Sequence, residues 1–344
     1  MKFIKGLGCF AILLFTLFLP VNAHAEEGAG FTVTPVLGKD QTDPAAGYFS
    51  IKGEQNESYP VTVAVQNLTE NENQDFDVQL VQATTSNNGH IDYTPSSKKM
   101  IAGGLSLKDL VEEKKATQKV TVAAGQTKNI TFNLKLPQDN VKGTVLGSVY
   151  VRKVPKETAK SKGVGVRNAF AMTIPVIISE DFNKKITPKL ALTNAQMKSD
   201  TGVPKVVGEV SNQAPSMFGQ IKVEAWVTEK GKTDKLYQSQ SEKYEMAPYS
   251  SFEYTIDTNN HLLKPGKYTY HMLMKSGDKS FDMARDFTVD SKSRETVNSK
   301  LLEGEKSNTN LLWIIAAVVG SSIIIFLVAY GLGKRKGDTD DEDE

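Results

Sequence analysis

Apolar and polar residues alternate along most of the chain between positions 30 and 290. From Val61 to Gln66, valine occupies every second position. The same period recurs at Phe76-Val78-Leu80, Ile130-Phe132-Leu134, Ile221-Val223-Ala225, Phe252-Tyr254-Ile256 and Tyr268-Tyr270-Met272. Alternation in short runs separated by polar turns predicts half-buried antiparallel strands. Spread over roughly 200 residues, it predicts a mainly β protein with two immunoglobulin-like sandwich domains.

One helix is expected within this region. Ser106 is placed to cap it, with Asp109 three residues later and three apolar residues on one face: Leu107, Leu110 and Val111. Such spacing is typical of a helix N-terminus. The segment is short enough to be a loop decoration.

The two halves of the chain share landmarks. A strand pattern ends at Asn67 in the first half and at Asn212 in the second, and Phe76 and Ile221 each follow nine residues later. A second spacing is also shared, from Gly125 to Gly143 and from Pro248 to Gly266. The first half is longer between these landmarks, and the excess holds the expected helix. A repeat of one sandwich explains this spacing, and chance spacing in β-rich chains is the alternative.

The domain limits follow from these patterns and from composition. The first sandwich is predicted over residues 26–182 and the second over residues 183–290, with the boundary in the polar stretch before Pro188. Residues 291–310 are rich in Ser, Lys, Glu and Asn, which predicts a polar stalk.

An uncharged stretch of 22 residues runs from Leu311 to Leu332 and includes Trp313. As a helix it would be about 33 Å long, enough to cross a bilayer. It is followed by a basic triplet, Lys334, Arg335 and Lys336. Basic residues at this end predict a transmembrane helix with a cytoplasmic tail, residues 333–344. The alternative is a buried core helix, which rarely lacks a polar stripe over such a length.

The N-terminus predicts a signal peptide over residues 1–25. Two lysines precede an apolar run, and Ala23-His24-Ala25 is a small-x-small cleavage site ending at Ala25. Cleavage would remove the single cysteine, so the mature chain would contain no disulfide. The two termini together predict a single-pass type I protein, which crosses the lipid bilayer once.

Composition and motif content argue against several classes of function. Net charge is +1, so a nucleic-acid partner is not expected. The four histidines have no metal-ligand spacing, no thiol remains after cleavage, and no G-x-S-x-G is present. The sequence therefore predicts no enzyme, no metal site and no cofactor. The candidate ligand-binding residue is Trp226, on the outward phase of its strand, for which a packing contact is the alternative.

Motifs in both halves are similar to those of one family. In the first half they are FTVTP (31–35), GYFSIKG (47–53), PVTVAVQN (60–67), NNGHIDY (87–93) and SLKDLV (106–111). In the second they are AFAMTIPVII (169–178), EMAPYSSFEY (245–254), KPGKYTYHM (264–272) and ARDFTV (284–289). In this order they resemble the WxL-interacting proteins of Gram-positive bacteria. The sequence departs from the family pattern at Glu54-Gln55-Asn56, where Pro-Gly is common, and near Phe281, where a Trp is common.

The resemblance implies a role. The first domain would bind peptidoglycan, the second would bind host extracellular matrix ligands, and the protein would act beside secreted WxL-domain surface proteins. The leading hypothesis is a non-enzymatic adaptor or adhesin that tethers these partners to the membrane, with its ectodomain in the wall zone and its C-terminus in the cytoplasm. The alternative is a carbohydrate-binding component of a polysaccharide-utilising surface complex. The resemblance supplies no ligand-contacting residues.

Overall fold

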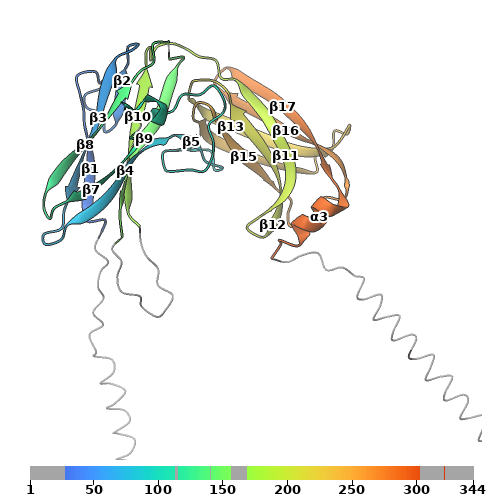
Figure 1. The fold of residues 1–344 in the computed structure, drawn as a ribbon. Helices are drawn as coiled ribbons and strands as arrows, with labels where there is room; N and C mark the ends of the chain where they lie inside the picture. Colours follow the sequence, from blue (N-terminus) through green and yellow to red (C-terminus); the bar gives the residue numbers. More distant parts are fainter. Residues whose placement is uncertain (1–27, 113–114, 140, 156–168, 303–320, 322–344) are drawn as a thin grey trace, which may run out of the picture. The chain divides into compact units, whose positions relative to one another are not determined.

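The computed structural model describes residues 28–112, 115–139, 141–155, 169–302 and Ser321 (Figure 1). The described chain divides into two compact units. Unit 1 takes the residues up to Leu190 together with Ser211–Gly219 and Glu245–Phe252. Unit 2 takes Ala191–Val210, Gln220–Tyr244 and the chain from Glu253 onward.

Unit 1 is built from two facing sheets, as the alternation predicts. The three-stranded sheet has the order β1 (Phe31–Val36), β3 (Ser58–Asn67), β8 (Thr127–Lys135). The five-stranded sheet has the order β2 (Phe49–Lys52), β10 (Ala171–Ser179), β9 (Thr144–Lys153), β4 (Gln74–Gln82), β7 (Thr117–Val122). Neighbouring strands in these two sheets pair antiparallel, except β2 with β10, which pair parallel. Apolar residues from both sheets form one buried cluster, because each strand turns every second side chain inward.

An insertion separates β4 from β7. It contains the hairpin β5 (Thr84–Thr85) and β6 (Ile91–Asp92), then a loop and the single-turn helix α2 (Leu107–Leu110). The predicted helix is confirmed: the Asp109 carboxylate accepts hydrogen bonds from the backbone N–H and the hydroxyl of Ser106, at 2.9 and 2.7 Å. Leu107 and Leu110 are buried against the sheets.

The second pair of sheets lies largely in unit 2. One has the order β11 (Leu190–Asp200), β12 (Val203–Asn212), β15 (Ser250–Asp257). The other has the order β14 (Tyr237–Met246), β13 (Phe218–Glu229), β16 (Gly266–Ser276), β17 (Lys279–Val289). Tyr270 of β16 links them: its hydroxyl donates to the Tyr254 carbonyl at 3.0 Å, and its ring fills the space left by Gly208.

Strand order confirms the internal repeat. The order β1-β3-β8 corresponds to β11-β12-β15, and β10-β9-β4-β7 corresponds to β17-β16-β13-β14. In unit 1, β2 and the insertion are additions to the shared plan. The domain limits 26–182 and 183–290 remain predictions, since the two compact units exchange segments along the chain and therefore do not test these limits.

The helix α3 (Ser291–Asn298) lies where the sequence predicts a polar stalk. Asp290 caps it by accepting a hydrogen bond from the Ser293 N–H at 2.6 Å. Val297 is its one buried residue, so the segment has no apolar stripe from which a helix could be predicted. The Leu302 N–H donates to the Gly202 carbonyl at 3.0 Å, which holds the chain against the β11–β12 turn.

The predicted signal peptide with its cleavage residue Ala25 lies outside the described residues, as do the basic triplet 334–336 and the span 311–332 apart from Ser321. Among the described residues, no helix has the length and apolar character needed to cross a membrane.

Candidate functional site

The outer face of the five-stranded sheet carries a polar surface on β4, β7 and β9. Asp77 lies opposite Lys119 on one side and Arg152 on the other, and the next row is Gln79 between Thr117 and Tyr150. Because alternate residues of β4 point into the core, these side chains face outward as a set. They line a cavity of about 490 Å³ together with Thr94 and Pro95.

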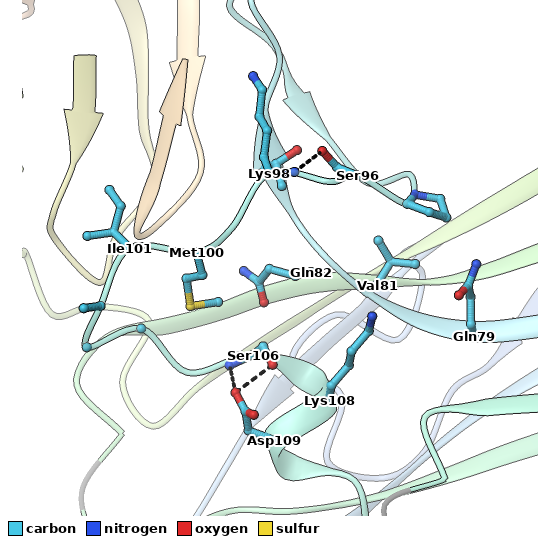
Figure 2. Close-up of a pocket in the computed structure, with 15 residues that line it drawn as sticks. Gln79, Val81, Gln82, Ser96, Lys98, Met100, Ile101, Ser106, Lys108 and Asp109 are labelled. Carbon is cyan, nitrogen blue, oxygen red and sulfur yellow. Dashed lines mark hydrogen bonds between the residues drawn. The ribbon is translucent and has the colours of Figure 1, made fainter. Parts of the chain in front are cut away.

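A second cavity, of about 400 Å³, shares Gln79 and Pro95 with the first. Its other walls come from the insertion and from Val81 and Gln82 of β4. We call the two cavities together the sheet groove. Figure 2 shows its insertion end, where the loop from Ser96 to Ser106 curves around Gln82 and Val81, with Lys98 and Lys108 on opposite sides.

An ion pair orders the open end of the groove. Arg152 Nη2 donates to Asp77 Oδ2 at 2.6 Å, and the arginine side chain is 45% exposed against 18% for the aspartate. An exposed pair of this kind adds little stability. Its effect is to hold the guanidinium beside Tyr150 with further N–H groups available to a ligand.

The insertion wall is held by contacts at several points. Lys98 Nζ donates to the Thr85 carbonyl at 2.6 Å and to Asn87 Oδ1 at 2.9 Å. The Ile101 N–H donates to the Tyr249 carbonyl at 2.9 Å within unit 1. This wall is therefore preformed, which lowers the entropy cost of binding.

Leu107 seats α2 on the sheet. It packs where β9 has Gly147: a Cβ there would lie 2.5 Å from Leu107 Cδ1 and 2.3 Å from the Val81 carbonyl oxygen. The missing side chain allows α2 to approach β9 closely, and this seat places Lys108 at the groove.

The groove combines hydrogen-bonding groups, one aromatic ring and a surplus of positive charge. Four cations line it, Lys98, Lys108, Lys119 and Arg152, against two carboxylates, Asp77 and Asp109. Amide and hydroxyl groups can bind sugar hydroxyls and N-acetyl groups, the Tyr150 ring can pack against a sugar face, and the cations can bind carboxylates.

The two outward carboxylates near the start of β4 are both engaged by neighbouring side chains. Asp77 is paired with Arg152, and Asp75 Oδ1 accepts from the Thr121 hydroxyl at 2.6 Å. The described part of the chain contains no group of three or more His, Cys, Asp or Glu residues able to hold a metal ion.

Trp226, the candidate from sequence, lies in unit 2 and is half-buried. Its ring stacks on that of His271, with centroids 5.1 Å apart and planes 5° apart. Lys235 Nζ lies 4.5 Å from the ring centroid. The His271 Nε2 and Thr228 Oγ1 atoms are 3.1 Å apart, and burial lowers the pKa of His271 below 6.5. The ring is thus engaged by its own neighbours.

Sequence reasoning missed the groove residues. The period-two pattern already placed Asp77 and Gln79 on an outward face. It did not show that Lys119, Tyr150 and Arg152 join them, because the register between strands distant in sequence is set by tertiary packing.

Two protein-family models match the chain. The model described as "WxL Interacting Protein, peptidoglycan binding domain" matches residues 31–153, and "WxL Interacting Protein, host binding domain" matches residues 161–299. Every residue of the sheet groove falls within the first match. None of the curated proteins compared matches the chain.

Several solved structures match the chain at low similarity. A chaperone–tip adhesin complex of CFA/I fimbriae has 15% identity and a TM-score of 0.28, covering 72% of this chain and 94% of that one. The Pseudomonas aeruginosa CupB2 chaperone has 13% identity and a TM-score of 0.23, covering 67% and 93%. The E. coli chaperone DraB has 13% identity and a TM-score of 0.24, covering 76% and 97%. TM-scores this low carry no functional information. The family matches do: with two domain models spanning most of its length, this chain belongs to the WxL-interacting protein family.

Proposed function

We propose that this protein is a non-enzymatic surface adaptor that binds peptidoglycan through the sheet groove and holds partner proteins at the membrane. The observation that carries the proposal is the location of a preformed, polar, net-positive groove inside the residues matched by the peptidoglycan-binding model. Peptidoglycan offers N-acetylated sugars and stem-peptide carboxylates, and the groove offers the complementary groups.

A retention assay on purified wall sacculi tests the groove. The full-length chain in detergent micelles is expected to sediment with sacculi. Tyr150→Ala combined with Arg152→Gln should weaken retention about tenfold or more, because it removes a ring and a charged donor from one wall. The matched control is Asn133→Ala with Lys128→Gln on β8, where both residues are exposed on the other sheet. Equal retention of both double variants, or no retention of the wild type, would reject the groove as the site.

We further propose that unit 2 binds host matrix ligands, that WxL-domain proteins are the surface partners, and that both units are immunoglobulin-like sandwiches. The matched host-binding model and the strand order support these assignments. Pull-down of a secreted WxL-domain protein by the full-length chain tests the partner, and failure to recover it would remove the adaptor role.

Anchoring is proposed on the sequence of residues 311–332. A chain that ends before Leu311 should be released into the soluble fraction, whereas the full chain should resist alkaline extraction from membranes. Extraction of both to the same extent would contradict the anchor.

A further inference from the structure

Unit 2 contains a cavity of about 740 Å³, which we call the unit 2 cavity. Three segments of unit 2 form it: the end of β13 at Glu229 and Lys230, the start of β14 at Leu236 and Tyr237, and residues 261–268 leading into β16. It lies within the residues matched by the host-binding model.

Hydrogen bonds hold the walls of this cavity. The Tyr268 hydroxyl donates to the Lys264 carbonyl at 2.8 Å, and the Lys230 N–H donates to the Lys267 carbonyl at 2.9 Å. The loop ahead of them is fixed by Thr258, whose hydroxyl donates to the buried Pro204 carbonyl at 2.8 Å. A ligand would therefore meet a preformed site.

The interior of the cavity is apolar. Leu262 and Leu263 are buried in its wall, Pro265 adds a further apolar surface, and the Tyr268 ring stacks on Phe287 behind it. Leu236 lines the same cavity with 40% of its surface exposed, so it adds an accessible apolar contact beside these residues. This combination fits an apolar or aromatic side chain of a ligand.

The rim of the cavity is positively charged. Lys230 is paired with Asp286 at 2.6 Å, and Glu229 is paired with Lys232, so these residues largely neutralise one another. Lys264 and Lys267 also line the cavity, and no carboxylate of the described chain lies within ion-pair distance of either. Two lysine charges thus face the opening.

We propose that the unit 2 cavity binds an acidic peptide segment of a partner protein, with an apolar or aromatic side chain inside and flanking carboxylates on Lys264 and Lys267. The edge strand β14 supports a peptide ligand, because it begins at the cavity and pairs on one side only among the described strands. A sulfated glycan could pair its sulfate groups with the lysines. It would offer no apolar group to contact Leu236, Leu262 and Pro265.

Selection from a random library of short displayed peptides tests the proposal, with the full-length chain in micelles as bait. Recovered peptides are expected to carry an apolar or aromatic residue beside Asp or Glu, and their binding should weaken as salt rises. Lys267→Glu should weaken binding about tenfold or more. Leu236→Ser should weaken it with no change in the salt dependence. The matched control is Lys275→Glu on the same strand, where the lysine is also exposed.

Several outcomes would overturn the proposal. These are recovery of no peptide, recovery of peptides without acidic residues, and equal loss in the Lys267→Glu and Lys275→Glu variants. Stronger binding of heparin than of any recovered peptide would assign the site to a sulfated glycan instead. The proposal rests on the proposed ligand-binding role of unit 2 and is separable from the groove, because sacculus retention should be unchanged in the Lys267→Glu variant.

Discussion

Asn67 and Asn212 make three corresponding hydrogen bonds each, at equivalent ends of β3 and β12. The Asn67 amide donates to the Glu72 and Val122 carbonyls at 2.7 and 3.1 Å, and the Asn212 amide donates to the Ser216 and Ala247 carbonyls at 2.8 and 3.1 Å. Each side-chain oxygen accepts from the N–H two residues later, at 3.0 and 3.1 Å. Both side chains are fully buried. Each asparagine therefore closes one turn and links it to a segment distant in sequence, the end of β7 for Asn67 and the turn after β14 for Asn212.

Replacing either asparagine by alanine should be strongly destabilising. Asn67→Ala removes the amide donor to the buried Val122 carbonyl, and Asn212→Ala removes the one to the buried Ala247 carbonyl. We expect each to lose roughly 2–4 kcal/mol of unfolding free energy. Calorimetry of the full chain measures the loss. Amide hydrogen exchange should also accelerate in the turn next to each substituted residue.

Asn129→Ala is the matched control, because Asn129 is exposed on β8. It should change stability by less than about 0.5 kcal/mol. If Asn67→Ala proved as mild as Asn129→Ala, the turn would not depend on the buried amide.

These asparagines also show what the sequence could predict. Identical spacing from Asn67 to Phe76 and from Asn212 to Ile221 suggested a repeat, since a buried asparagine with a fixed turn imposes that spacing on the next strand. The period-two pattern placed the core residues of both sheets for the same local reason. It could not give α3, because Val297 alone is buried there.

The sheet groove could not be predicted from the sequence, for a different reason. Tyr150 and Arg152 lie more than 70 residues from Gln79 and Asp77 along the chain, and their contact depends on register. The insertion that forms the other wall carries no periodic pattern. Its position follows from Leu107 fitting over Gly147, a close approach that only the folded backbone reveals.

Gly147→Ala tests the close packing of Leu107 against Gly147 on β9. The added methyl group would meet the Val81 carbonyl oxygen at 2.3 Å and Leu107 at 2.5 Å, so β4, β9 or α2 must shift. We expect a loss of about 1–3 kcal/mol and weaker sacculus retention, since α2 carries Lys108. Calorimetry and the retention assay measure the two effects. Gly38→Ala is the control, because a Cβ there meets nothing within 4 Å; equal stability of both variants would refute the close packing.

His271 should make stability depend on pH. Its pKa is lowered chiefly by burial and also by Lys235, against the opposing effect of Asp282 and Asp286. In the unfolded chain the pKa returns to about 6.5, so on acidification the unfolded state takes up the proton first. Stability is therefore full above pH 6.5 and falls as pH drops from 6.5 towards the folded pKa.

The measurement is the melting temperature of the chain between neutral and mildly acidic pH. In the His271→Gln variant the part of the decline that belongs to His271 should disappear. The carboxylate of Asp286, whose pKa is lowered by hydrogen bonds from Lys230 and Thr269, acts in a separate window below its ordinary value of 3.8. A His271→Gln profile parallel to the wild type would contradict the assignment.

Trp226→Ala separates the packing and sugar-binding roles of that ring. If the indole mainly shields His271, its removal should let water reach the imidazole and raise the His271 pKa towards 6.5, with a stability loss of about 0.5–1.5 kcal/mol from the lost stack. A nuclear magnetic resonance titration of His271 measures the shift, with Lys222→Ala on the same strand as the control. Glycan and sacculus retention should be unchanged, because the ring is already occupied by His271 and Lys235. An unshifted His271 together with lost glycan retention would instead support the carbohydrate-binding alternative and make Trp226 its contact residue.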